Sequence, residues 1–192
     1  MTAMTSLPTV LVLASGRGAR FAASGGTVHK LQADLAGKPV LQHTLDAVRA
    51  SGLPWHLEDV GHAGMGDSIA AAVRATSAAA GWLILPGDLP LVQPDTLRQI
   101  ASAAPSPVLV PVHQGQRGHP VRFATECGPE LVNLTGEKGA ARVLLAYAAI
   151  NSVAFLAVDD VGIVTDIDTL DDLRRAHALL ADRSMVGQGG AS

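Results

Sequence analysis

The 192 residues predict one α/β domain, in which helices cover both faces of a mixed, mostly parallel sheet. Two observations carry this prediction. Short aliphatic runs alternate along the chain with segments whose apolar residues recur at helical spacing. Two of the runs are separated only by a short glycine-containing stretch, which adds an antiparallel hairpin. The chain has no internal repeat and no linker, so we expect a single domain at 1–183 and a flexible tail at 184–192.

The expected strands are uninterrupted β-branched and aliphatic runs, typical of strands buried on both faces. The first run ends in Ser15-Gly16, and the third is closed by Pro86-Gly87. We expect strands at 9–14, 55–60, 82–85, 107–113, 120–123 and 153–158, with the hairpin turn at 115–118.

The expected helices are recognised by their end signals. Gly52 ends a helix at 39–51, and Asp67 or Ser68 caps an alanine-rich helix that continues to Ala79. Pro94 opens the next helix at an early position, where its missing N–H costs nothing. Further helices are expected at 139–149 and 169–180.

Composition excludes several classes of function. Lys plus Arg number 14 against 17 Asp plus Glu, a net charge of −3, whereas a general nucleic-acid surface needs a basic face. The single cysteine, Cys127, excludes an internal disulfide and a cysteine-built zinc site. The chain has neither a basic signal-peptide region before Arg17 nor an apolar run long enough to span a membrane. We therefore expect a cytoplasmic protein with no nucleic-acid or membrane partner.

The loop after the first expected strand has the composition of an anion site. Gly16 and Gly18 let backbone N–H groups approach an anion closely, and Arg20 supplies a guanidinium that suits phosphate oxygens. Phe21 stands where the dinucleotide fingerprint requires a glycine, which disfavours a dinucleotide-dependent reductase. The alternative interpretation is a glycine-rich turn with two solvated arginines.

Lysine and aspartate residues follow at other loops. Lys30 is positioned to reach the same phosphates, although most lysines are simply solvated, and we interpret His29 as structural. Asp88 lies directly beyond a buried strand and suits a hard cation such as Mg²⁺, unless it is an ordinary turn residue. Asp166 and Asp168 alternate along an extended stretch and face one side. One is a candidate cap of the last helix and the other a candidate metal ligand, and their spacing does not choose between them.

Three further segments combine glycine with polar side chains. Arg117-Gly118-His119-Pro120 joins a cation and an imidazole in a loop, and Gly136 to Arg142 opens a helix whose amides suit an anion. A plain hairpin turn and an ordinary helix start are the alternatives. At Gly64 to Ser68, helix capping explains the residues without any ligand.

In their order along the chain, these segments resemble the motifs of the MobA-like NTP transferase family. The resemblance is closest to the members that transfer a cytidylyl group to molybdopterin, and it extends from about Val10 to His177. It is carried by 13–21, 29–31, 37–40, 64–68, 85–90, 117–121 and 166–169. Each motif alone is weak, but seven in the family's order are specific.

The resemblance implies a three-layer, Rossmann-like nucleotide-diphospho-sugar transferase fold, similar to glycosyltransferase A. It implies a Mg²⁺-dependent enzyme that moves a nucleotidyl group, CMP from CTP in the favoured reading, to a phosphorylated acceptor such as molybdopterin. Pyrophosphate is released. A transient contact with the molybdoenzyme that receives the cofactor, or with its chaperone, follows from the same resemblance.

The resemblance also implies roles for individual residues. The implied catalytic residues are Arg20, Lys30 and Asp88. The implied nucleotide site comprises Ala14, Ser15, Gly16, Arg17, Gly18, Arg20, Lys30, Gly64 and Ser68. The implied acceptor site comprises Arg117, His119, Gly139 and Arg142, and the implied metal ligands are Asp88, Asp168 and, less directly, Asp166.

Three alternatives keep part of this interpretation. A guanylyltransferase of the same family, or a cytidylyltransferase acting on a sugar or polyol phosphate, retains the fold and changes the substrates. A non-catalytic accessory domain would bind a triphosphate without turning it over. Trials of each triphosphate with different acceptors separate these alternatives.

Overall fold

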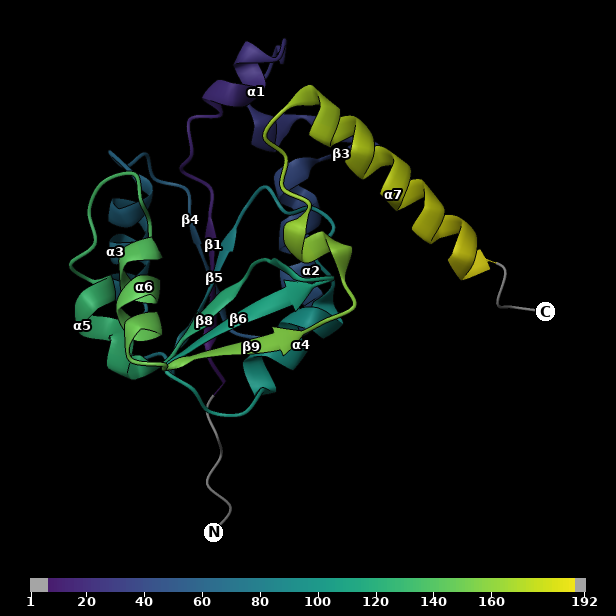
Figure 1. Ribbon diagram of the computed structural model, residues 1–192. Coiled ribbons are helices and arrows are strands. Elements are labelled where there is room, and N and C mark those ends of the chain that lie inside the picture. The colour runs from purple at the N-terminus through teal and green to yellow at the C-terminus, as the bar shows by residue number, and fades with distance from the viewer. Residues whose placement is uncertain (1–6, 189–192) are drawn as a thin grey trace.

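The computed structural model describes residues 7–188, and a seven-stranded mixed sheet forms their centre (Figure 1). The strand order is β4-β1-β5-β8-β6-β7, and β9 pairs with β6. The strands are β1 (Thr9–Leu13), β4 (Trp55–Glu58), β5 (Trp82–Pro86), β6 (Val108–His113), β7 (Gln116–Arg117), β8 (Val121–Phe123) and β9 (Val153–Ala157). A separate two-stranded sheet pairs β2 (Asp34–Leu35) with β3 (Lys38–Pro39).

Helices cover both faces of the large sheet, as the sequence predicts. They are α1 (Ala19–Ala23), α2 (Val40–Ser51), α3 (Met65–Ala75), α4 (Pro94–Ser102), α5 (Gly128–Leu131), α6 (Ala141–Ala149) and α7 (Leu170–Gln188). The 3-10 turns are η1 (Lys30–Gln32), η2 (Thr125–Cys127) and η3 (Val161–Val164). No helix within residues 7–188 is both long and apolar enough to cross a membrane.

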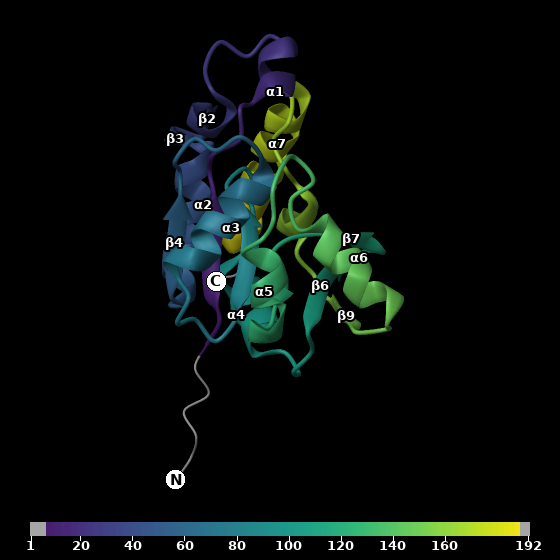
Figure 2. The same ribbon diagram turned by 90° about the vertical axis from the view of Figure 1, so that its left-hand side faces the viewer.

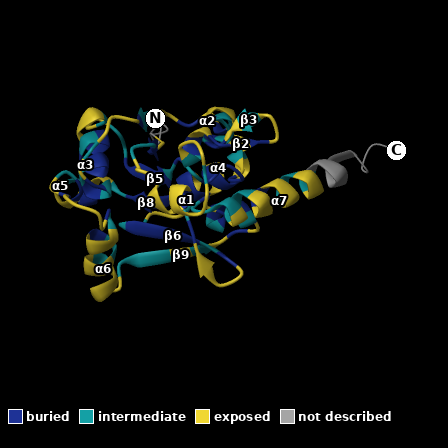
Figure 3. Ribbon diagram, turned by 90° about the horizontal axis from the view of Figure 1, so that it is seen from above, coloured by how far each residue is buried: buried dark blue, intermediate teal, exposed yellow. Residues whose placement is uncertain are grey.

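Two apolar cores lie on opposite faces of the sheet because successive side chains of each strand point to opposite sides. Leu11 and Ile84 pack with α3, α5 and α6 on one face, whereas Val10 and Leu85 pack with α2 and α4 on the other. A third cluster around Leu35 joins η1 and the small sheet to α7. In Figure 3, β6 is buried between these layers, while α6 is largely exposed.

The direction of the strands determines what lies at the upper edge of the sheet. β1 pairs in parallel with β4 and β5, so the carboxyl ends of all three strands meet at one edge. β8 runs antiparallel to β5, with Ile84 opposite Val121, so the segment that precedes β8 arrives at that same edge. In Figures 1 and 2, α1 and the start of α7 stand above it.

Several expected boundaries differ from the structure. α3 begins at Met65 after an N-cap at Gly64 and ends at Ala75, so neither Asp67 nor Ser68 caps it. The hairpin turn is tighter than expected, because Gln116 and Arg117 already pair with β6 as β7. The last helix continues to Gln188, into the segment where we expected a tail, and residues 189–192 of that tail lie outside the described residues.

Candidate active site

Three adjoining cavities open at the carboxyl edge of the sheet, and all three are lined by Arg20 and Met65. The loop cavity, about 360 Å³, is bounded by residues 15–20 and 62–65. The carboxylate cavity, also about 360 Å³, contains Asp88, Asp166 and Asp168. The apolar cavity, about 530 Å³, lies between the sheet, α3 and α6.

The loop after β1 is held in shape by His29. Gly18, at a φ of 64°, adopts the left-handed conformation that glycine tolerates best, and a Cβ there would lie 3.4 Å from the His29 ring. Nδ1 of His29 accepts from the Leu31 N–H at 3.3 Å, so Nε2 carries the proton and donates to the Gly16 carbonyl at 2.6 Å. His29 is therefore structural, as expected, and it fixes the loop beside Lys30.

Ser68 supports this loop from below. Its hydroxyl donates to the Gly64 carbonyl at 3.2 Å, so the 2.5 Å contact between the two hydroxyls has Ser15 as donor and Ser68 as acceptor. Ser68 is fully buried and does not line the loop cavity, and Ala14 likewise packs into the core. Of the expected nucleotide residues, 15–18, 20, 30 and 64 line the cavity directly.

The start of α3 carries a second loop, 135–139. The Gly66 N–H donates to the Gly136 carbonyl at 2.7 Å, and the Asp67 carboxylate accepts from the Gly136 N–H at 2.9 Å. A Cβ on Gly66 would lie 2.8 Å from the Thr135 backbone, so only glycine permits this close approach. Asp67 thus holds a loop whose Glu137 lines the loop cavity.

Asp88 is positioned by backbone contacts from two neighbouring segments. The N–H of Gly87 donates to the Leu13 carbonyl of β1 at 2.9 Å, which sets the loop against the strand. The Ile167 N–H donates to the Asp88 carbonyl at 3.0 Å, which brings Asp168 alongside. Asp88 and Ile167, which are 79 positions apart in the chain, are therefore joined at the end of β5.

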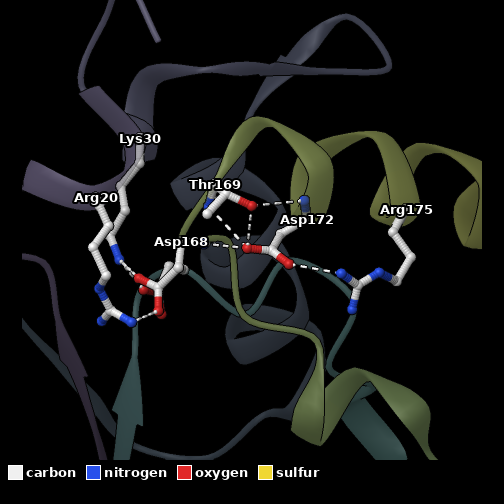
Figure 4. A network of polar contacts seen from close by, with 7 residues as sticks. Arg20, Lys30, Asp168, Thr169, Asp172 and Arg175 are labelled. Carbon is white, nitrogen blue, oxygen red and sulfur yellow. Dashed lines mark hydrogen bonds and ion pairs between the residues drawn. The ribbon is translucent and has the colours of Figure 1, made fainter. Parts of the chain in front are cut away.

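Lys30 and Arg20 contact these carboxylates, and Figure 4 shows both cations beside Asp168. Nζ of Lys30 lies 2.5 Å from Oδ2 of Asp88 and 2.9 Å from Oδ1 of Asp168, and Arg20 contacts the other oxygen of Asp168 at 2.6 Å. Burial disfavours the charged ammonium, but the two carboxylates outweigh burial and raise the pKa of Lys30. Lys30 is thus a cation in this arrangement.

The carboxylate cavity has the donor set of a hard divalent cation. Magnesium binds through one or two carboxylates together with substrate phosphates, and Asp88 and Asp168 supply two. Oδ1 of Asp88 is buried and has no hydrogen-bond partner among the described residues, so it retains a free lone pair for a ligand. No group of three or more His, Cys, Asp or Glu within residues 7–188 forms a metal cluster of protein ligands alone.

Asp166 lines the same cavity but makes no contact with Lys30. Burial raises the pKa of Asp166, and the negative charges of Asp168 and Asp88 raise it further. The expected choice of one aspartate as helix cap is wrong for both residues. Thr169 caps α7 instead, because its hydroxyl accepts from the Asp172 N–H at 3.2 Å.

Arg117 and His119 border both the carboxylate and the apolar cavities. Gly118 between them packs so closely on the Ile163 carbonyl that a Cβ would lie 2.4 Å away. Nδ1 of His119 is buried without a partner among the described residues, and burial lowers the pKa of this imidazole. Arg117 stacks on Phe155, with 5.0 Å between its guanidinium carbon and the ring centre.

The start of α6 differs from the expectation. The helix begins at Ala141, so Gly136 to Ala140 form a loop rather than its first turn. Gly139 lines the apolar cavity, whereas Arg142 is exposed on α6 and does not line any of the three cavities. The structure therefore brings together Arg117, His119 and Gly139, but not Arg142.

Sequence reasoning missed a polar group at the end of β4. The buried carboxylate of Glu58 accepts from Nε2 of His62 at 2.9 Å and from Nε2 of His56 at 3.3 Å, and His62 lines the loop cavity. The sequence could have indicated this group, because β4 is a parallel strand and its carboxyl end must lie at the same edge of the sheet as those of β1 and β5.

Comparison with known proteins now identifies the family. The model of the MobA-like NTP transferase domain matches residues 47–153, more than half of the chain. The chain belongs to this family. Its fold is the Rossmann-like nucleotide-diphospho-sugar transferase fold, as expected: a nucleotidyl transferase from Methanothermobacter thermautotroptrophicus, 20% identical, superposes with a TM-score of 0.75 over 92% of this chain and 99% of that chain.

Relatives with higher identity are found as well. Purine catabolism protein PucB of Bacillus subtilis (strain 168) is 34% identical over 118 residues, which cover 59% of this chain and 57% of that protein. The chain thus spans little more than half of this curated relative. Rv0371c of Mycobacterium tuberculosis H37Rv is 28% identical, with a TM-score of 0.73 over 89% of this chain and 98% of that one. A structure of Rv0371c has been determined in complex with manganese.

Proposed function

We propose that the protein is a Mg²⁺-dependent nucleotidyltransferase that moves CMP from CTP to a phosphorylated acceptor and releases pyrophosphate. Molybdopterin is the acceptor that we favour. The observation that carries this proposal is the grouping of Lys30, Asp88 and Asp168 beside Arg20. It combines cations for a triphosphate with carboxylates for a metal at one edge of the sheet.

The loop cavity is the proposed nucleotide site. Backbone N–H groups of Gly16 and Gly18, with Arg17, Arg20 and Lys30, would bind the triphosphate, and Ser15 and Gly64 would adjoin the nucleoside. Asp88 and Asp168 would hold Mg²⁺, which neutralises phosphate charge and orients the leaving group. We prefer Asp168 to Asp166 as second ligand because Lys30 joins Asp168, but not Asp166, to Asp88.

The acceptor would lie across the other two cavities. Arg117 and His119 stand at their shared border, where a guanidinium and an imidazole suit a phosphate monoester. The larger cavity is lined by Leu13, Ile69, Ile84, Val110, Val121, Phe123 and Leu144. This apolar wall suits the faces of a flat heterocycle such as a pterin, whose polar edge groups would pair with charged residues that also line the cavity, among them Glu137 and Lys138.

The chemical step requires no protein base. A phosphate monoester, whose second pKa is about 6, is largely dianionic near neutral pH. Its oxygen forms the new bond to the α-phosphorus while the bond between that phosphorus and the bridging oxygen breaks, and pyrophosphate leaves. The side chains align two polyanions and neutralise their charge.

A thermal-shift series with CTP, GTP, ATP and UTP, each with and without Mg²⁺, tests the proposal first. Binding at a hundred times Kd adds about 2.7 kcal/mol of stability. A Mg²⁺-dependent shift with CTP, followed by pyrophosphate release with molybdopterin, is the expected result. A shift with GTP alone would transfer the assignment to guanylyl transfer. Binding without pyrophosphate release would indicate an accessory domain, and no shift at all would overturn the nucleotide site.

The cellular setting belongs to the same proposal. A cytoplasmic enzyme would pass its product to a molybdoenzyme or its chaperone through a transient contact. We expect a molybdoenzyme to co-purify with the tagged protein from cells that make molybdopterin, and not from cells that do not.

A further inference from the structure

We propose that Lys30 acts as an internal counter-cation, whose ammonium occupies the cation position while the nucleotide is absent and leaves it when a triphosphate binds. The inference rests on the proposed function, since it concerns the same two carboxylates. It adds a coupling between nucleotide and metal that neither the fold nor the family match describes.

The contact geometry makes the two cations mutually exclusive. Nζ of Lys30 lies 2.5 Å from Asp88 and 2.9 Å from Asp168, and the three side chains are only 13%, 14% and 16% exposed. A magnesium ion that bridged the pair through these same two oxygens, Oδ2 of Asp88 and Oδ1 of Asp168, would lie about 2.1 Å from each. An ammonium and a divalent cation do not share such a space, so one must leave when the other enters.

The negative charge of the two carboxylates explains why a lysine lies between them. Two carboxylates held close together in a partly buried site repel each other and need a nearby positive charge. Arg20 supplies only part of it, because its side chain is 77% exposed and, within residues 7–188, forms an ion pair with Asp168 but not with Asp88. Lys30 is the described cation that touches both carboxylates, so the ligand-free protein is stabilised by the same contact that blocks the metal.

The Lys30 ammonium also has a second position within reach, in the loop cavity. Lys30 lines both the carboxylate cavity and the loop cavity, and its flexible side chain extends from η1 beside Gly18. A triphosphate in the loop cavity would offer the ammonium new anionic partners. Nucleotide binding would thereby free Asp88 and Asp168, and by thermodynamic reciprocity the metal would strengthen nucleotide binding.

Mn²⁺ binding to the nucleotide-free protein, followed by electron paramagnetic resonance, tests the proposal. Lys30→Met removes the charge at nearly constant length, and we expect it to bind Mn²⁺ about tenfold more tightly than the unmodified protein, within the usual range of such couplings. Lys30→Arg keeps the charge and should bind Mn²⁺ as weakly as the unmodified protein. Equal or weaker Mn²⁺ binding by Lys30→Met would overturn the proposal.

The matched control is Lys38→Met. Nζ of Lys38 lies 2.5 Å from Asp46 in an ion pair whose side chains are about 40% exposed, and neither residue lines the carboxylate cavity. Its loss should leave Mn²⁺ affinity unchanged. A gain equal to that of Lys30→Met would show a general charge effect and would also overturn the proposal.

A second measurement uses the unmodified protein and remains decisive if Lys30→Met does not fold. The sequence contains three lysines, Lys30, Lys38 and Lys138, so labelling with an amine reagent can be quantified for each by mass spectrometry. Saturating Mg²⁺ without nucleotide should increase labelling of Lys30 several-fold and leave Lys38 unchanged. Mg²⁺ binding with no change at Lys30 would refute the exchange. Because both tests omit nucleotide, their outcome is independent of whether CTP is the substrate.

Discussion

Thr169 and Asp172 exchange hydrogen bonds across the first turn of α7. The Asp172 N–H donates to Oγ1 of Thr169 at 3.2 Å, and the Thr169 N–H donates to Oδ2 of Asp172 at 2.8 Å (Figure 4). This pair is a capping box. The same oxygen of Asp172 accepts from the Asp168 N–H at 3.2 Å. The cap of the last helix therefore also fixes the backbone that carries a proposed metal ligand.

Removal of this cap should affect both stability and the site. We expect Asp172→Ala to lower the free energy of unfolding by about 1 kcal/mol. Because Asp168 then loses its backbone partner, Mn²⁺ affinity in the presence of CTP should fall as well. Urea unfolding and Mn²⁺ titration measure the two effects. Asp171→Ala is the control, because Asp171 is exposed and its ion-pair partner among the described residues is Arg174 alone. Identical behaviour of the two variants would contradict the linkage.

Asp88→Ala should nearly abolish transfer. A metal held by Asp88 contributes several kcal/mol of transition-state stabilisation, and about 1.4 kcal/mol corresponds to a tenfold change in rate. We expect the rate of pyrophosphate release to fall about a thousandfold, and Arg20→Ala to fall in a similar range. Asp95→Ala, in an exposed ion pair on α4, serves as control. Retention of activity within about tenfold in either variant would refute the assignment.

The Glu58 carboxylate predicts how stability depends on pH. Burial favours its protonated form, but hydrogen bonds from His62 and His56 outweigh burial and lower the pKa of Glu58 below its usual value of 4.5. A carboxylate with a lowered folded-state pKa stabilises the fold above its unfolded pKa, and this contribution is lost as the pH falls through the folded value.

We therefore expect the free energy of unfolding to decrease with acidification below about pH 4.5, and to decrease less steeply in Glu58→Gln. Urea unfolding at a series of pH values between 6 and 3 measures the slopes, with Glu126→Gln as an exposed comparison. Equal slopes in Glu58→Gln and the unmodified protein would show that Glu58 titrates normally.

Replacement of Arg122 should lower the stability of the fold without weakening CTP binding. Its buried guanidinium donates to the carbonyls of Ile100, Ala103 and Ala104, where α4 ends. Hydrogen bonds from a charged donor contribute about 1.5–3 kcal/mol, so Arg122→Met should destabilise the fold by about 3 kcal/mol. Arg122 pairs opposite Leu83 near the start of β5, away from Asp88, so CTP-dependent thermal shifts should persist.

A matched variant completes this test. Arg98→Met removes an exposed guanidinium that donates to one carbonyl, that of Ala50, and should cost far less. Destabilisation by Arg122→Met no larger than that of Arg98→Met would contradict the role of the buried guanidinium.

The sequence alone predicts the order of strands and helices well, because each strand or helix is specified by a hydrophobic pattern within its own residues. The runs at β1, β5 and β6 are apolar throughout, and their burial on both faces follows from that pattern. Short elements such as α1 and β2 escape prediction, because five and two residues are too few to show a period. The sequence predicts the last helix only to Leu180, whereas α7 continues past Gly187 to Gln188.

The sequence also predicts part of the candidate site, because some of its residues lie in loops with local signals. Glycine-rich loops at strand ends are visible in the sequence, so the loop after β1 and Asp88 could be identified. The partners of those residues are set by tertiary contacts. Nothing in the sequence around Asp168 indicates that Ile167 bonds to the Asp88 carbonyl, or that Lys30 reaches both carboxylates. The family resemblance implies an acceptor role for Arg142, whereas its side chain is exposed on α6 and lines none of the three cavities.

The reversed direction of β8 has a consequence for how such a site evolves. Because β8 runs against β5, Arg117 and His119 arrive at the sheet edge from a hairpin that shares no backbone with the loop at 14–30. Substitutions in that hairpin would alter the apolar and carboxylate cavities, which it lines, and leave the loop cavity, which it does not line, unchanged. The proposed acceptor site and the proposed triphosphate site thus rest on different stretches of backbone, so substitutions can change one without changing the other.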